Sequence, residues 1–194
     1  MKKSYDCLIV GIGGQGTILA SNVLGDACVM EGRHVRGAET HGMSQRGGSV
    51  ETHIRIDGKY GSLIAPGTAD LLIAFDVLEA LRYRHFLKPS GTIIANREMV
   101  VPTSVFSSKM PVPRIEDVEA ELKNSGAKVI LLDATKLAAE AGSPLAANIV
   151  LLGAASHTLP LAAKSLEDAV RRNVPPKTVD INVKAFAAGK EAGA

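Results

Sequence analysis

Six residues near the start of the chain form a pattern in which glycines are spaced for binding a phosphate. They read Gly11-Ile12-Gly13-Gly14-Gln15-Gly16, directly after a short apolar run and directly before a helical pattern that starts at Thr17. Glycines in this context allow a tight turn and close approach of the backbone, and the following helix N-terminus favours an anion. The pattern predicts an anion-binding turn. The alternative is that the glycines only permit close packing of strand and helix.

A dinucleotide site needs one further residue, an acid that binds the ribose about 20 residues beyond the fingerprint. Glu31 comes too early for this role, and Glu39 lies in a segment without regular periodicity. An independent NAD(P)-binding dehydrogenase therefore remains an alternative for which neither the ribose acid nor a catalytic residue can be placed.

The irregular segment at residues 37–48 contains a second candidate anion site. It includes the run Glu39-Thr40-His41-Gly42-Met43-Ser44-Gln45-Arg46-Gly47-Gly48. A guanidinium beside two flexible glycines can bind a phosphate or carboxylate through two hydrogen bonds while the backbone approaches closely. Arg46 with Gly47 and Gly48 could do this, or Arg46 could simply cap a backbone carbonyl.

The tripeptide Glu-Thr-His occurs twice, which places carboxylates and imidazoles at Glu39, His41, Glu51 and His53. Such groups at alternate positions of a strand could ligate a metal. Half-exposed strands also place polar residues at alternate positions, so we assign no metal site. Nucleophile–base sets converge in space rather than in sequence, and we assign no catalytic residue.

Composition excludes several classes of protein. The chain has 194 residues, 46% hydrophobic and 22% charged, with a net charge of +2. That is typical of a globular protein, gives no support for nucleic-acid binding, and includes no apolar run of the roughly 20 residues that span a membrane. Its 2 cysteines are too few for an iron–sulfur cluster, which normally takes four thiolates. We expect a cytoplasmic protein with both thiols buried and reduced.

Strands alternate with helices along most of the chain. Apolar or alternating runs predict strands at residues 6–10, 34–36, 49–56, 70–75, 92–95 and 128–132. Asp57-Gly58 indicates a hairpin leading to one more strand near residues 60–64. Helices are expected from Thr17, from Asp76 with Glu79 as its capping partner, from Glu116, and over most of the chain after residue 134. This order predicts a three-layer α/β fold: a Rossmann-like, mainly parallel sheet with helices on both faces, forming a single domain over residues 1–194.

Three stretches together resemble the gamma-type subunit of the 2-oxoacid:ferredoxin oxidoreductases. They are residues 9–16 (IVGIGGQG), 39–50 (ETHGMSQRGGSV) and 70–83 (DLLIAFDVLEALRY). The similarity continues through residues 147–154, 174–177 and 185–186, so it covers nearly the whole chain, and HGMSQRGGSV is its most specific part. Within the family the small subunits that serve indolepyruvate are the most similar, with the pyruvate, 2-oxoglutarate and branched-chain enzymes as alternatives.

The resemblance implies a complex that oxidatively decarboxylates a 2-oxoacid, transfers the acyl group to coenzyme A and passes electrons to ferredoxin. Thiamine diphosphate, Mg and 4Fe-4S clusters would lie on a larger alpha subunit, with no cofactor bound by this chain alone. The residues expected near coenzyme A, at the subunit interface, are Gly11, Gly13, Gly14, Gln15, Gly16, Arg46, Gly47 and Gly48. The residues expected to contact the partner are Glu39, His41, Met43 and Gln45.

Overall fold

The described part of the chain, in this computed structural model, comprises residues 3–41, 48–59, 61–101, 105 and 111–194. Its six strands form one sheet in the order β2-β3-β1-β4-β5-β6. The strands are β1 (Tyr5–Ile12), β2 (Val35–His41), β3 (Ser49–Ile56), β4 (Ala69–Ala74), β5 (Leu87–Asn96) and β6 (Lys128–Leu132).

The sheet is mainly parallel, as predicted. β1 pairs in parallel with β4, β4 with β5, and β5 with β6. β3 is antiparallel to both of its neighbours, β1 and β2. The central strand β1 is buried from Asp6 to Ile12, which is typical of a strand with helices on both of its faces.

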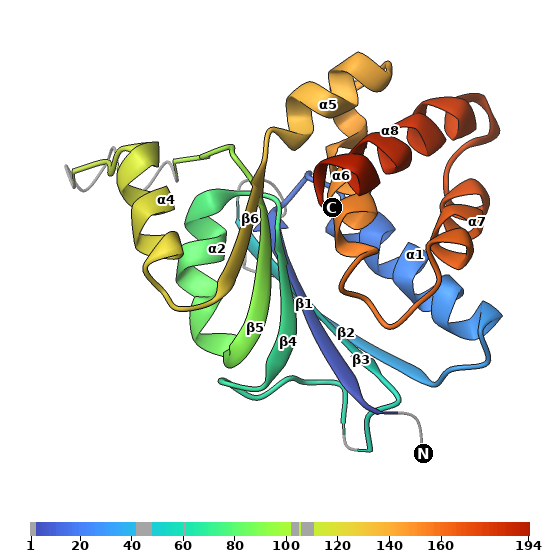
Figure 1. Ribbon diagram of the computed structural model, residues 1–194, viewed down its shortest axis with the longest axis horizontal. Coiled ribbons are helices and arrows are strands. Elements are labelled where there is room, and N and C mark those ends of the chain that lie inside the picture. Colours follow the sequence, from blue (N-terminus) through green and yellow to red (C-terminus); the bar gives the residue numbers. More distant parts are fainter. Residues whose placement is uncertain (1–2, 42–47, 60, 102–104, 106–110) are drawn as a thin grey trace.

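Helices cover both faces of the sheet, which confirms the three-layer α/β fold. Figure 1 shows one group of helices on one side of the strands and a second group on the other. The first group is α2 (Val77–Tyr83) and α4 (Ile115–Lys123). The second group is α1 (Thr17–Met30), α5 (Ala134–Ala141), α6 (Ala147–Ala155), α7 (Ala163–Asn173) and α8 (Val179–Ala192).

The alternation of side chains along β1 divides the core between these two layers. Cys7 and Ile9 belong to the apolar cluster beneath the larger group of helices, and Leu8 and Val10 belong to the cluster beneath α2 and α4. α6 is the most apolar helix, and it is buried from Asn148 to Ala155.

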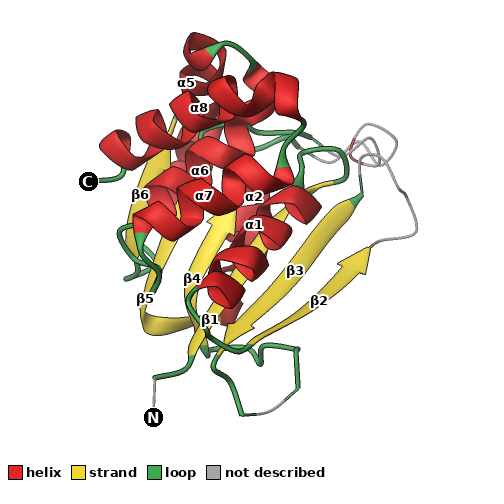
Figure 2. Cartoon of the chain, turned by 90° about the vertical axis from the view of Figure 1, so that its right-hand side faces the viewer, coloured by secondary structure: helices red, strands yellow, loops and turns green. Residues whose placement is uncertain are grey.

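Two local predictions were wrong. Residues 37–41 are not irregular: β2 continues to His41, because it pairs with β3 along its whole length. Asp57, with a φ of 52°, does form a turn, but residues 61–64 are not a strand. β3 already has a partner on each side, β1 and β2, so it has no free edge for a hairpin strand (Figure 2).

In the part of the chain that the structure describes, no helix is long and apolar enough to cross a membrane. The cytoplasmic location and the single-domain organisation of residues 1–194 stay predictions.

Candidate functional site

Four parallel strands, β1, β4, β5 and β6, end beside one another at the edge of the sheet that carries the glycine-rich turn. The chain leaves β1 towards β2 and β3 on one side, and leaves β4 towards β5 and β6 on the other. The direction of winding therefore reverses between β1 and β4. In open α/β sheets, ligands bind in the crevice at the carboxyl ends of the strands where this reversal occurs.

The turn after β1 is closed by its own glutamine. The N–H of Ile12 donates to Gln15 Oε1 at 2.7 Å, and the N–H of Gln15 donates to the Ile12 carbonyl at 3.1 Å. A Cβ at Gly11 would lie 2.8 Å from Gln15 Oε1, so a larger residue there would displace the glutamine. Gly14, at φ 107°, adopts a backbone conformation that glycine tolerates best.

Gly16 joins the turn to the buried helix α6. It has a φ of 86°, and its carbonyl accepts a hydrogen bond of 3.2 Å from Asn148 Nδ2. A Cβ at Gly16 would lie 2.5 Å from the same nitrogen. Asn148 is only 3% exposed, and its Oδ1 accepts from the N–H of Ile149. The sequence had not singled out Asn148, although an amide within an apolar helix is a signal that could have drawn attention to it.

The N-terminus of α1 presents backbone donors towards this edge. Gly16 caps the helix without a side-chain hydrogen bond, and the first turn contains no acidic residue. Among the described residues no acceptor is found for the N–H groups of Gly14, Gly16 and Thr17. The described residues therefore leave the positive end of the helix dipole without a negative partner, and the turn can accept an anion.

A pocket of about 250 Å³ lies beside this helix end. Its lining comes from the segments that follow β1, β4 and β5, from α5, from the turn before α6 and from α6 itself. It consists of Gly14, Gln15, Phe75, Asn96, Glu98, Thr135, Pro144, Leu145, Ala147, Asn148 and Leu151. Five apolar and five polar side chains share the wall, so the pocket combines apolar surface with groups that can form hydrogen bonds.

The polar wall of the pocket is a hydrogen-bonded group of three side chains. Asn96 Nδ2 donates to Glu98 Oε2 and to Thr135 Oγ1, both at 3.0 Å, and Thr135 Oγ1 donates to the same oxygen of Glu98 at 2.8 Å. Asn96 is 3% exposed and its Oδ1 accepts from the N–H of Ala134. The Glu98 carboxylate is thus held in place at the pocket.

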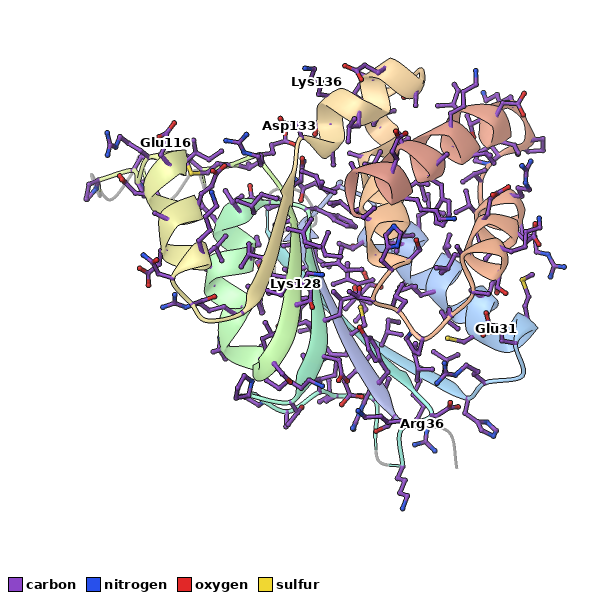
Figure 3. All side chains as sticks on the ribbon, in the orientation of Figure 1. Glu31, Arg36, Glu116, Lys128, Asp133 and Lys136 are labelled. Carbon is purple, nitrogen blue, oxygen red and sulfur yellow. The ribbon has the colours of Figure 1, made fainter. Side chains whose placement is uncertain are left out.

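A second, more open hollow of about 420 Å³ continues from this wall and shares Asn96, Glu98, Thr135 and Pro144 with the pocket. Asp133 and Lys136 line it as well, and Figure 3 shows both at the end of the sheet where β6 leads into α5.

The start of α2 closes the other side of the switch point. Asp76 is fully buried, caps α2 as predicted, and accepts from the N–H groups of Leu78 at 2.7 Å and Glu79 at 3.2 Å. The N–H of Val100 also donates to this carboxylate. Burial raises the pKa of the Asp76 carboxyl, although the three donors oppose that change. Asp76 therefore has a structural role.

The structure brings together the glycine turn, residues 11–16, and the end of the second motif, residues 39–50. The N–H of Gly13 donates to the Gly48 carbonyl at 2.9 Å. Ser49 Oγ donates to the buried carboxylate of Glu79 and lies 3.1 Å from the Tyr83 hydroxyl. The second motif is thus anchored to both the glycine turn and α2. Met43, Gln45, Arg46 and Gly47 lie outside the described residues.

The paired Glu-Thr-His residues do not converge on a metal. Glu39 on β2 is opposite Thr52 on β3, and paired residues share a face of the sheet. Glu51 and His53 therefore lie on the other face, where the Glu51 carboxylate is 3.7 Å from His53 Nε2. No cluster of three or more metal-ligating side chains is found within the described ranges. His41 is the last residue of β2.

The strand order also argues against a dinucleotide site. In that site, the ribose acid ends the strand next to β1. Here β3 lies between β1 and β2, so Glu39 is one strand too far from the glycine turn. An independent NAD(P)-binding dehydrogenase would therefore lack the ribose-binding acid that it needs beside the glycine turn.

Neither cysteine fits a cluster or a catalytic thiolate. Cys7 and Cys28 are both fully buried in the apolar core, and burial raises the pKa of both thiols. A thiolate, which metals and electrophiles require, is therefore disfavoured at both positions. An iron–sulfur cluster does not fit the residues of this chain.

A glycine-rich turn at the switch point of a mainly parallel sheet defines an α/β protein with a candidate anion-binding turn. The chain belongs to the pyruvate ferredoxin/flavodoxin oxidoreductase family, whose model matches residues 6–192. It is thus a subunit of an oxidoreductase complex of the 2-oxoacid:ferredoxin type, as the sequence resemblance implied.

Individual relatives support the assignment. An indolepyruvate oxidoreductase subunit from Pyrococcus horikoshii is 40% identical over 194 positions, which cover 98% of this chain and 96% of the relative. A 2-oxoglutarate synthase subunit from Methanothermobacter marburgensis is 31% identical, covering 94% of this chain and 93% of the relative. The crystal structure of the gamma subunit of a keto/oxoacid ferredoxin oxidoreductase from Geobacter sulfurreducens superposes with a TM-score of 0.71 at 25% identity, covering 97% and 98% of the two chains.

Proposed function

We propose that this chain is the small subunit of an indolepyruvate:ferredoxin oxidoreductase. The observation that carries the proposal is the difference in identity, 40% to the indolepyruvate subunit against 31% to the 2-oxoglutarate subunit, at similar coverage. The complex would decarboxylate an arylpyruvate oxidatively, form the acyl-coenzyme A and reduce ferredoxin.

The cofactors of this reaction belong to a larger partner subunit in our proposal. Thiamine diphosphate with Mg would supply the electron sink, and 4Fe-4S clusters would conduct the electrons to ferredoxin. Two buried thiols give this chain no means of ligating a cluster. Its own contribution would then be to bind and orient a substrate and to complete the assembly.

The substrate is tested with the assembled complex. The chain is co-expressed with its larger partner, and coenzyme A-dependent reduction of ferredoxin is measured with indolepyruvate, pyruvate, 2-oxoglutarate and a branched-chain oxoacid at equal concentrations. We expect the largest kcat/KM for indolepyruvate. A larger value for any non-aromatic oxoacid would overturn this part of the proposal.

We further propose that the glycine turn and the second motif bind the phosphates of coenzyme A. The residues are Gly11, Gly13, Gly14, Gln15, Gly16, Arg46, Gly47 and Gly48. Support comes from the N–H groups at the start of α1, which have no acceptor among the described residues, and from the hydrogen bond that joins Gly13 to Gly48. A guanidinium next to this helix end would add charge-assisted hydrogen bonds to a phosphate.

The competing role for the second motif is contact with the partner. In this view Glu39, His41, Met43 and Gln45 pack against the larger subunit, and Arg46 belongs to the same interface. Both roles predict loss of activity when Arg46 is removed, so activity alone cannot separate them.

Two measurements on the Arg46→Ala complex do separate them. Loss of a charge-assisted hydrogen bond should raise the KM for coenzyme A about tenfold or more, with assembly unchanged on size-exclusion chromatography. Arg171→Ala is the matched control, because Arg171 lies on α7 and pairs only with Glu167 among the described residues. An unchanged KM would overturn the phosphate role, and loss of the complex would favour the partner role.

A further inference from the structure

We propose that Glu79 is a positioning residue whose buried carboxylate fixes the junction between the second motif and β3, and so holds that motif against the glycine turn. The inference rests on the proposed coenzyme A site, because its effect is read in the binding of that substrate. It concerns a side chain of α2 that belongs to neither motif and does not line the 250 Å³ pocket.

The Glu79 carboxylate is used outside the N-terminus of its own helix. Three residues after an N-cap, a glutamate side chain commonly returns to the N–H of the capping residue. Here only the backbone N–H of Glu79 bonds to Asp76. Among the described residues, the carboxylate accepts instead from Ser49 Oγ at one oxygen and from Arg82, at 2.7 Å, at the other. The side chain therefore joins α2 to the start of another element.

Stability alone does not explain a carboxylate at this position. Glu79 is 2% exposed, whereas the side chain of its cationic partner Arg82 is 57% exposed. Such a pair offsets only part of the free energy that burial of the charge costs, and an apolar side chain of similar volume is often as stable. The hydrogen bond to Ser49 is the specific contact that an apolar side chain would lose.

The carboxylate also sets the direction of a short chain of hydrogen bonds. A carboxylate beside an arginine only accepts, so the single hydroxyl proton of Ser49 goes to Glu79. The Tyr83 hydroxyl, 3.1 Å from Ser49 Oγ, is then the donor in that contact. Ser49 is thus held by two side chains of α2, and its hydroxyl cannot turn away without losing one of the two hydrogen bonds.

Through Ser49 this restraint reaches the candidate site. Ser49 is the first residue of β3 and is paired with Ile12, the last residue of β1. The carbonyl of the preceding residue, Gly48, accepts from the N–H of Gly13 at 2.9 Å. A displacement of Ser49 would move Gly48 and weaken its hydrogen bond to the turn. Glu79 therefore acts on the phosphate site through Ser49 and not by contact with the ligand.

The test is a double-mutant cycle on the assembled complex, in which the KM for coenzyme A and kcat are measured for Glu79→Gln, Ser49→Ala and the double variant. We expect each single substitution to raise the KM about fivefold or more and to change kcat less than about twofold, because binding is weakened and not the chemistry. The double variant should resemble the single ones, because both substitutions remove the same hydrogen bond.

Glu119→Gln is the matched control. Glu119 is also a buried glutamate, 7% exposed, and an arginine with a 43% exposed side chain, Arg97, donates to it at 2.7 Å. It lies on α4, in the same helix layer as α2, and its hydrogen bonds within the described part of the chain go to Arg97. A general effect of removing a buried carboxylate would appear in both variants, whereas the KM should rise only in Glu79→Gln.

A wild-type KM in Glu79→Gln, or effects of Glu79→Gln and Ser49→Ala that add in full, would overturn the positioning role. If Glu79→Gln does not fold, Tyr83→Phe removes the other hydrogen bond to Ser49 and keeps the ring; a raised KM is expected, and an unchanged one would overturn the role.

The Arg46→Ala complex distinguishes this failure from failure of the coenzyme A site. If Arg46→Ala raises the KM and Glu79→Gln does not, the phosphate site stands and only the role of Glu79 fails. If Arg46→Ala, Glu79→Gln and Ser49→Ala all leave the KM unchanged, the coenzyme A proposal fails together with this one.

Discussion

Gly16 meets two separate requirements that only glycine satisfies. Its φ of 86° lies in the left-handed region, and its missing Cβ leaves room for Asn148 Nδ2. The first requirement is conformational and the second is steric. Gly14 shares the first without the second, since nothing lies within 4 Å of the position that a Cβ would occupy there.

We therefore expect Gly16→Ala to destabilise the protein more than Gly14→Ala does. Both substitutions carry the left-handed penalty of about 1–2 kcal/mol, and Gly16→Ala also disrupts the hydrogen bond from Asn148, at about 1 kcal/mol more. Urea unfolding of the two variants gives the comparison. Equal free energies of unfolding would show that Asn148 adjusts at no cost.

His53 gives the protein a pH-dependent stability. It is 2% exposed, and its Nδ1 accepts a hydrogen bond of 3.1 Å from the N–H of Ile64. Burial lowers the pKa of His53 from 6.5, and the nearby Glu51 only partly opposes this. As the pH falls below 6.5, the unfolded chain takes up a proton on His53 before the folded protein does. The free energy of unfolding that neutral His53 contributes is therefore complete above pH 6.5 and is lost as the pH falls towards the lowered pKa.

His53→Asn should remove this dependence, because its amide oxygen can accept from Ile64 without titrating. We expect the stability of wild type relative to the variant to fall between pH 7.5 and pH 5, measured by urea unfolding at about four pH values. His34→Asn, at an exposed position, is the control and should follow wild type. A wild-type curve parallel to that of His53→Asn would contradict the account.

Residue roles were predictable from the sequence where the interaction is local. The glycine turn and the Asp76 cap of α2 were both found, since each depends on neighbours within a few positions. Asn148 and Glu98 were not, because the first contacts Gly16 from 132 positions away and the second contacts Thr135 from 37 positions away. Only the fold brings such pairs together.

At the level of elements, the strands and helices with strong apolar patterns were predicted well, and β2 was not. Residues 37–41 include Gly37 and Ala38, which have low strand propensity, and their apolar content is small. They are extended because β3 supplies a complete row of backbone partners. Tertiary pairing thus overrides local preference at the sheet edge that leads into the second motif.

Helices α6 and α8 approach each other closely in the core, backbone against backbone. A Cβ at Gly189 would lie 1.9 Å from the Val150 carbonyl oxygen, and one at Gly153 would lie 2.1 Å from that of Phe186. Both obstacles are backbone atoms, which side-chain rotation cannot move. The two helices must therefore separate to admit even a methyl group.

We expect Gly189→Ala to destabilise the protein by about 1–3 kcal/mol, as overpacking of a core does. Gly25→Ala on α1 is the matched control: nothing lies within 4 Å of its Cβ position, so the same change should stabilise the helix by about 0.5–1 kcal/mol. Thermal unfolding compares the two. A Gly189→Ala protein as stable as wild type would show that the helices are not in contact at this point.

On the scale of the whole molecule, our proposal assigns the ligand-binding edge and the redox chemistry to different chains. The carboxyl edge of the sheet carries the glycine turn, the pocket and the polar wall of Asn96, Glu98 and Thr135. Both cysteines are in the core, remote from solvent. In our proposal the chain binds and positions a substrate, and it depends on a partner subunit for electron transfer.

The most direct test of this division of roles between the two subunits is whether the larger subunit needs this chain for catalysis. The larger subunit is purified alone, and indolepyruvate- and coenzyme A-dependent reduction of ferredoxin is followed as increasing amounts of this chain are added. The account predicts almost no turnover by the larger subunit alone and a saturable rise as the chain is added. Full activity of the larger subunit without this chain would contradict it.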